Sequence, residues 1–170
     1  AFEERVSDQF FKSYNIDSGF AFKGTKKIIH LYNISKDEAE ESMNYISNFW
    51  STDGIDSIFD LQKLATHYAI ADLVDGHHTH FRANCLYVYD YNTKKISPVG
   101  KEWSTPYIQN KPSKTFDLFF LNPEIDPDYH EIFIKNKQLK EKYIKCLKKI
   151  SQEQYIKRFI SNYKENIENQ

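Results

Sequence analysis

Residues 60–103, DLQKLATHYAIADLVDGHHTHFRANCLYVYDYNTKKISPVGKEW, decide how the rest of this chain folds. Apolar side chains fill most positions from Asp60 to about Val74, which predicts a central, buried helix. A polar turn follows, and residues 84–89 and 95–99 have the pattern of a β-hairpin. Charged, glycine, histidine and asparagine residues are thus concentrated between two elements that favour burial. We expect any binding or catalytic site to lie in this stretch.

The composition is that of one folded domain without a strong overall charge. The chain has 170 residues, 40% of them hydrophobic, which is enough for one packed core. Its 23 basic and 24 acidic residues leave a net charge of −1, so no global attraction to nucleic acid or to an anionic membrane is expected. No apolar run approaches the roughly 20 residues of a membrane span. Cys85 and Cys146 are too few for a disulfide framework, but their spacing leaves one bond between them open.

The first part of the chain predicts a helix and a small hairpin. Residues 2–14 have the apolar spacing of an amphipathic helix, and residues 20–24 and 26–32 favour two short strands. Lys23 lies near the end of the first strand. A solvated lysine and an anion or phosphate contact are both compatible with that position.

A helix between the first hairpin and residue 60 is predicted from its ends. Ser35 and Glu38 have the spacing of a capping box, in which a serine oxygen and a glutamate carboxylate satisfy amides at a helix start. The helix should run to about Trp50, and Gly54 lies in the break that follows it. The side chains expected to be buried are Met43, Ile46, Phe49 and Trp50.

The last third of the chain predicts a long loop followed by a helical tail. Residues 101–114 contain two prolines and lack periodicity, and residues 116–121 are an apolar segment expected to dock in the core. Pro127 suits a helix start. Residues 137–150 have helical apolar spacing, and residues 151–154 have the spacing of a second capping box. The whole chain is therefore expected to be α+β and mostly helical, with two hairpins.

The polar turn offers several kinds of chemistry. His77, His78 and His80, with Asp75, are competent zinc ligands, although no second ligand motif completes a site. A surface histidine cluster and a phosphate or catalytic pocket are the alternatives. Asn84 is placed either to cap the turn or to bind a divalent cation.

Other catalytic templates are absent from the sequence. The chain has no glycine-rich phosphate loop, nucleophile elbow, CxxC pair or helical HExxH motif. Glu102 follows the second strand of the hairpin, at a position typical of metal-binding or substrate-binding acids and equally of solvated ones.

The order of these features resembles the CotH family of spore-coat and surface-associated proteins, which have an atypical protein-kinase-like fold. The resemblance is carried by short motifs that match in order over most of the chain. They are residues 4–11 (ERVSDQFF), 19–23 (GFAFK), 71–78 (ADLVDGHH), Asn84 with 86–89 (LYVY), 92–98 (NTKKISP), 99–102 (VGKE) and the tail from Ile132 to Leu147.

The resemblance implies a kinase-like C-lobe in residues 35–170, with the hairpin at 84–100, and a remnant of the N-terminal lobe in residues 1–34. It implies ATP and Mg²⁺ or Mn²⁺ as cofactors. The roles that it assigns are as follows: Lys23 contacts nucleotide phosphates and Glu4 steadies it, His78 or Asp75 lies where the substrate hydroxyl is deprotonated, and Asn84 with Glu102 holds the metal.

Two positions depart from the family pattern. Glu102 stands where the family usually has an aspartate, and the second family acid falls near His78, where Asp75 is the nearest carboxylate. A longer acid moves the charge by about one methylene in a site whose geometry is demanding. The expected function is therefore an atypical Ser/Thr protein kinase, or a degenerate relative, at a cell or spore surface. The alternative is a non-catalytic interaction domain of a surface or coat assembly, with a protein partner.

Overall fold

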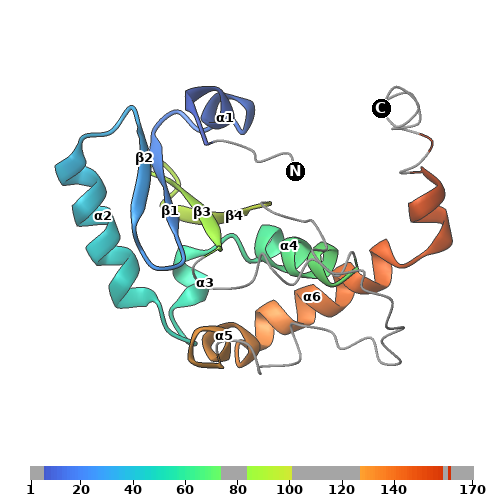
Figure 1. Cartoon of the computed structure of the whole chain (residues 1–170). Helices are drawn as coiled ribbons and strands as arrows, with labels where there is room; N and C mark the ends of the chain where they lie inside the picture. The colour runs from blue at the N-terminus through green and yellow to red at the C-terminus, as the bar shows by residue number, and fades with distance from the viewer. Residues whose placement is uncertain (1–5, 74–83, 101–126, 159–160, 162–170) are drawn as a thin grey trace, which may run out of the picture.

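The computed structural model describes residues 6–73, 84–100, 127–158 and 161. This part of the chain is an α+β domain, as the sequence predicts (Figure 1). The elements follow in the order α1 (Asp8–Ser13), β1 (Gly19–Lys23), β2 (Ile28–Tyr32), α2 (Lys36–Phe49), α3 (Ile55–Ile58), α4 (Leu61–Leu73), β3 (Leu86–Asp90), β4 (Lys95–Val99), α5 (Pro127–Ile134) and α6 (Lys137–Ile150).

The two expected hairpins are joined in one antiparallel sheet with the strand order β2-β1-β3-β4. Strand β1 pairs with β3 along its whole length, from Gly19 opposite Asp90 to Lys23 opposite Leu86. At Gly19 a Cβ atom would lie 2.0 Å from the carbonyl oxygen of Tyr89, so only glycine permits this approach of the two strands. The sheet thus connects residues that are about 70 positions apart in the chain.

Helices cover both faces of the sheet, which explains why its central strands carry almost no polar side chains. On one face, Phe10 and Phe11 of α1 pack against Ala21 and Val88. The other face contributes Phe20 to the main core beneath α2 and α4. Burial on both faces favours continuous apolar strands, the pattern of β1 and β3.

Helices α4 and α6 lie side by side and form the helical half of the core (Figure 1). Leu64, Ala65 and Tyr68 of α4 are buried, and so are Leu139 and Tyr143 of α6. The prediction of a buried central helix is therefore confirmed. Leu73, the last residue of α4, is 42% exposed.

The capping box at the start of α2 is confirmed. The Glu38 amide donates to the Ser35 hydroxyl oxygen at 3.2 Å, and the Ser35 amide donates to the Glu38 carboxylate at 2.9 Å. The prediction that Phe49 is buried is wrong, because its side chain is 38% exposed. It packs instead against Tyr45, with 4.8 Å between ring centroids, on the outer side of the helix.

The predicted capping box at residues 151–154 is also wrong. Ser151 ends α6, and its hydroxyl donates to the carbonyl oxygen of Lys148. The next helical turns, residues 153–158, begin with the Tyr155 amide donating to the carbonyl oxygen of Gln152. The expected helix starts at Pro127 and Lys137 are confirmed. The predicted loop at 101–114 and the apolar segment at 116–121 lie outside the described residues.

Cys85 and Cys146 are both free and buried, so they do not form the disulfide bond that the sequence left open. The Cys146 sulfur accepts a hydrogen bond from the side-chain amide of Gln62 at 3.2 Å, and the Thr66 hydroxyl lies 3.5 Å from it. Cys146 therefore acts as part of the packing between α4 and α6.

Candidate functional site

The candidate site lies at the end of the sheet where β1 stops and β3 begins. Lys23 is the last residue of β1 and is half-buried. Its amide donates to the carbonyl oxygen of Lys27 at 2.9 Å, and its own carbonyl accepts from the Lys26 amide at 2.7 Å. A tight turn between β1 and β2 therefore fixes the backbone that carries the Lys23 side chain.

Asn84 approaches the same place from the other hairpin. It is half-buried and lies two residues before Leu86, which pairs with Lys23. The amide of Gly24 donates to the carbonyl oxygen of Cys85 at 2.9 Å. The residues that follow Lys23 and Asn84 in sequence are thus hydrogen-bonded to each other. The structure brings together two residues that the sequence places 61 positions apart.

The third strand at this end is β4. Val99, its last residue, pairs with Leu86. The chain therefore leaves the sheet, three residues before Glu102, at the end that carries Lys23 and Asn84. Glu102 itself lies outside the described residues, as do the other predicted site residues Glu4, Asp75 and His78 and the histidines at 77 and 80.

A buried polar cluster that the sequence did not single out lies beside this end of the sheet. Asp72, on the last turn of α4, is 3% exposed and accepts a hydrogen bond from the Tyr143 hydroxyl at 2.6 Å. Tyr68, one turn earlier, is fully buried; burial raises the pKa of its phenol, and the nearby Cys85 and Asp72 raise it further. Because Cys85 follows Asn84 in sequence, its electrostatic interaction with Tyr68 connects the cluster to the candidate site.

The cluster was missed because its carboxylate sits in an apolar helical run. In sequence Asp72 is flanked by Ala71 and Leu73 and resembles a residue at the solvated edge of a helix. One signal was available, because Tyr143 shares the apolar face of α6 and a buried phenol requires a hydrogen-bond partner.

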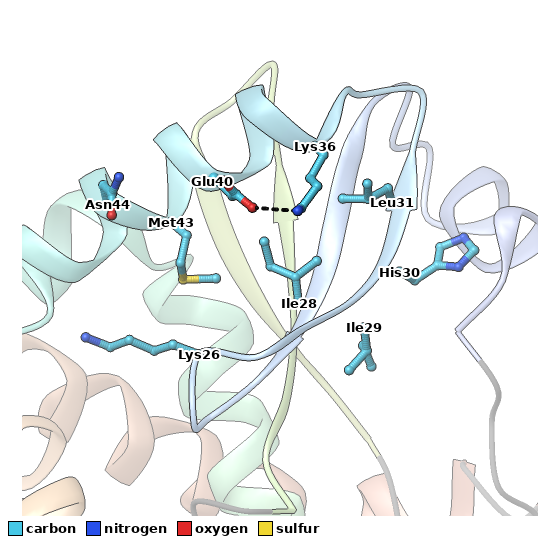
Figure 2. A pocket seen from close by; sticks show the side chains of 9 residues that line it. All are labelled: Lys26, Ile28, Ile29, His30, Leu31, Lys36, Glu40, Met43 and Asn44. Carbon is cyan, nitrogen blue, oxygen red and sulfur yellow. Dashed lines mark ion pairs between the residues drawn. The ribbon is translucent and has the colours of Figure 1, made fainter.

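A separate hollow lies on the opposite side of the first hairpin, between β2 and α2 (Figure 2). This open groove has a volume of about 860 Å³ and is lined by Lys26 and residues 28–31 on the strand side and by Lys36, Glu40, Met43 and Asn44 on the helix side. It contains Lys26, Lys36 and Glu40, and none of the predicted site residues.

The described part of the chain supplies no complete metal site. No three histidine, cysteine, aspartate or glutamate side chains are grouped there so that they could hold a metal ion. The zinc alternative at the polar turn therefore stays a prediction. No helix in the described ranges is both long enough and apolar enough to cross a membrane.

Comparison with known protein families, curated proteins and solved structures finds no match to this chain.

Proposed function

We propose that the chain is a CotH-like atypical protein kinase domain, or a degenerate relative of one. In this proposal it binds ATP with a divalent cation and transfers phosphate to serine or threonine of a protein substrate. The helical part of the domain corresponds to a kinase-like C-lobe, with α4 at its centre and the β3–β4 hairpin at the site. The order of motifs along the sequence supports this assignment.

The observation that carries the proposal is the convergence of Lys23 and Asn84 at one end of the sheet. These two residues were selected from separate motifs, and the pairing of Lys23 with Leu86 makes them neighbours. A lysine next to an amide oxygen is suited to a metal-bound phosphate chain, because the cation attracts phosphate and the amide oxygen is a ligand for Mg²⁺. The residue types therefore fit a nucleotide with its metal.

The remaining roles follow the family pattern. Glu102 with Asn84 would hold the metal, Glu4 would orient Lys23, and His78 or Asp75 would accept the proton of the substrate hydroxyl. The bound metal would neutralise charge on the phosphates. Phosphoryl transfer needs positioning and charge stabilisation more than covalent chemistry from the protein. The residue types named above can supply both. Because Glu102 replaces the usual aspartate, the protein could bind nucleotide and metal and yet transfer phosphate weakly or not at all.

Nucleotide binding is tested by thermal unfolding of the protein. With Mg²⁺ and ATP at about 100 times the dissociation constant, the melting temperature should rise by about 5–10 °C. Asn84→Ala and Lys23→Met should reduce the rise. Their matched controls are Asn92→Ala, an exposed asparagine at the far turn of the same hairpin, and Lys27→Met, an exposed lysine near Lys23.

Transfer is measured in parallel as radiolabel passed from ATP to a pool of serine and threonine peptides. A thermal shift with transfer identifies an active kinase, and a shift without transfer identifies a degenerate relative. No shift with Mg²⁺ or Mn²⁺ would overturn the proposal in favour of the interaction domain. Equal loss of the shift in the variants and in their controls would overturn the assigned site.

A further inference from the structure

Strand β2 and helix α2 enclose an open groove that contains none of the predicted site residues. β2 is an edge strand of the sheet, and within the described residues no strand pairs with its outer side. Figure 2 shows Lys36, Glu40 and Met43 of α2 facing the strand across the groove. An edge strand flanked by a helix is the arrangement in which several domains bind extended peptides by strand addition.

The edge of β2 carries exposed apolar side chains. Ile29 is 42% exposed and Leu31 is 37% exposed. Folded proteins usually protect such an edge with proline, charge or a covering element. The opposite edge strand, β4, does so with Pro98. β2 has a bulge at Ile29 but no proline, and its alternate backbone N–H and C=O groups point away from β1, as in any edge strand.

The side chains of the groove favour an occupant with acidic as well as apolar groups. Glu40 is already paired with Lys36, whose Nζ lies 3.3 Å from the Glu40 carboxylate. Lys26 lines the groove from the turn that precedes β2, with its Nζ 5.7 Å from the ring centroid of Trp50. Two lysines and one glutamate leave the lining with a formal charge of +1. Ile28 and Met43 provide an apolar wall.

We propose that this groove binds an extended, acidic peptide that adds to the sheet as a strand beside β2. The peptide backbone pairs with the outer edge of β2, an apolar side chain packs against Ile28 and Met43, and an acidic side chain lies near Lys26. Backbone pairing supplies the general affinity, and the pockets for alternate side chains supply the selectivity. This inference goes beyond phosphoryl transfer and stands whether or not the chain is a kinase.

A second copy of this chain fits the groove less well. The register shifts between Ala21 and Phe22, so Ile29 is an extra residue that bends the strand. Two packed β2 strands would each have to match this bend while held rigidly in their own sheets, whereas a flexible peptide can follow it. Symmetric pairing would also bring like-charged lysines from both copies to one surface.

The test is a selection of nonapeptides from a display library on the immobilised protein. The library alternates apolar or β-branched positions with positions that are either acidic or basic. We expect enrichment of acidic peptides, and we expect the selected peptides to shift the amide resonances of residues 28–32. N-methylation of alternate peptide amides should abolish binding, because it removes backbone pairing without altering the protein.

Charge reversal supplies the matched comparison. Lys26→Glu should weaken the selected acidic peptides about tenfold, the sum of a lost attraction and a new repulsion. Lys27→Glu makes the same change on an exposed neighbour outside the lining and should leave affinity unchanged. The proposal is overturned if no peptide is enriched over bare matrix, if N-methylated peptides bind equally well, or if sedimentation shows a β2-mediated dimer that excludes peptide.

Discussion

Two polar side chains of α4, the buried Asp72 and the half-buried His67, are kept from water by different physical means. Asp72 accepts the Tyr143 hydroxyl at 2.6 Å. Burial raises the pKa of the Tyr143 phenol, and the hydrogen bond and charge of Asp72 raise it further, so Tyr143 remains a donor at neutral pH. His67 loses proton affinity instead, because burial lowers its pKa to about 4.

The lowered pKa of His67 predicts a loss of stability in acid. An unfolded histidine titrates near pH 6.5, so between about pH 6.5 and pH 4 the unfolded state binds a proton that the folded state does not. This contribution to stability is fully present above pH 6.5 and is lost as the pH falls toward 4. We expect His67 to account for roughly 2 kcal/mol of unfolding free energy lost between pH 7 and pH 5.

Urea unfolding of the protein and of His67→Gln at both pH values measures this loss. The variant lacks the titrating group, so its stability should fall by less between pH 7 and pH 5 than that of the unmodified protein. His30→Gln is the control, because its ring is near the surface and bonded to Asp8 at 2.9 Å. Parallel pH curves for the protein and the His67 variant would contradict a desolvated His67.

At the scale of single residues, the sequence indicated candidate site residues but not which side chains would lie together or be buried. Lys23 and Asn84 were chosen from local pattern, and their proximity became apparent only through the pairing of β1 with β3. Asp72 and His67 went unnoticed because burial is a property of the assembled core. A polar residue in an apolar helical run has the same local sequence whether it faces water or the interior.

Among the elements, α3 and α6 are joined by one buried asparagine. Asn136 is the N-cap of α6, where its side-chain oxygen accepts from the Leu139 amide at 2.9 Å. Its side-chain nitrogen donates to the Asp56 carboxylate at 2.6 Å and to the carbonyl oxygen of Thr52 at 3.0 Å. One side chain thus satisfies the start of α6 and fixes it to α3 and to the segment before α3.

Asn136→Ala should therefore lower the free energy of unfolding by about 3 kcal/mol, because it removes a cap and the bonds of a buried side chain to the half-buried Asp56 and Thr52. Ser35→Ala is the matched control, since it removes an N-cap that is exposed and makes no bond to another element. Its expected cost is about 1 kcal/mol. Chemical denaturation of both variants measures the difference, and equal losses would show that the bonds of Asn136 to Asp56 and Thr52 contribute little.

Element boundaries were predictable where a local signal marks them. Ser35 and Glu38 define the start of α2 by their own hydrogen bonds, and Pro127 defines the start of α5 by its missing amide. The prediction failed where a signal had two readings. Ser151 has capping-box spacing with Gln154, yet the same hydroxyl is satisfied at the end of α6. Whether a serine caps the start of one helix or ends the helix before it depends on where that preceding helix stops.

For the molecule as a whole, one sheet and one aromatic cluster connect the parts of the chain. Trp50 follows α2 and contacts Phe22 in the sheet, Phe59 before α4 and Phe133 in α5, with ring centroids 5.2–6.4 Å apart. The sequence predicted two hairpins but not that they form one sheet. Pairing between strands about 70 residues apart produces no local sequence pattern other than the apolar strands themselves. The division into residues 1–34 and 35–170 stays a prediction.

The joint sheet and the contacts of Trp50 predict cooperative unfolding of the two hairpins and the helices. In a Trp103→Phe variant, in which Trp50 is the remaining tryptophan, fluorescence and far-ultraviolet circular dichroism should report one urea midpoint. Phe133→Ala, which removes a fully buried ring from the cluster, should lower the free energy of unfolding by about 3–5 kcal/mol and shift both signals together. Ile156→Ala, at a side chain that is 42% exposed, is the control and should shift neither signal. Separate midpoints would show that the sheet and helices unfold independently, as expected if residues 1–34 belong to a different lobe.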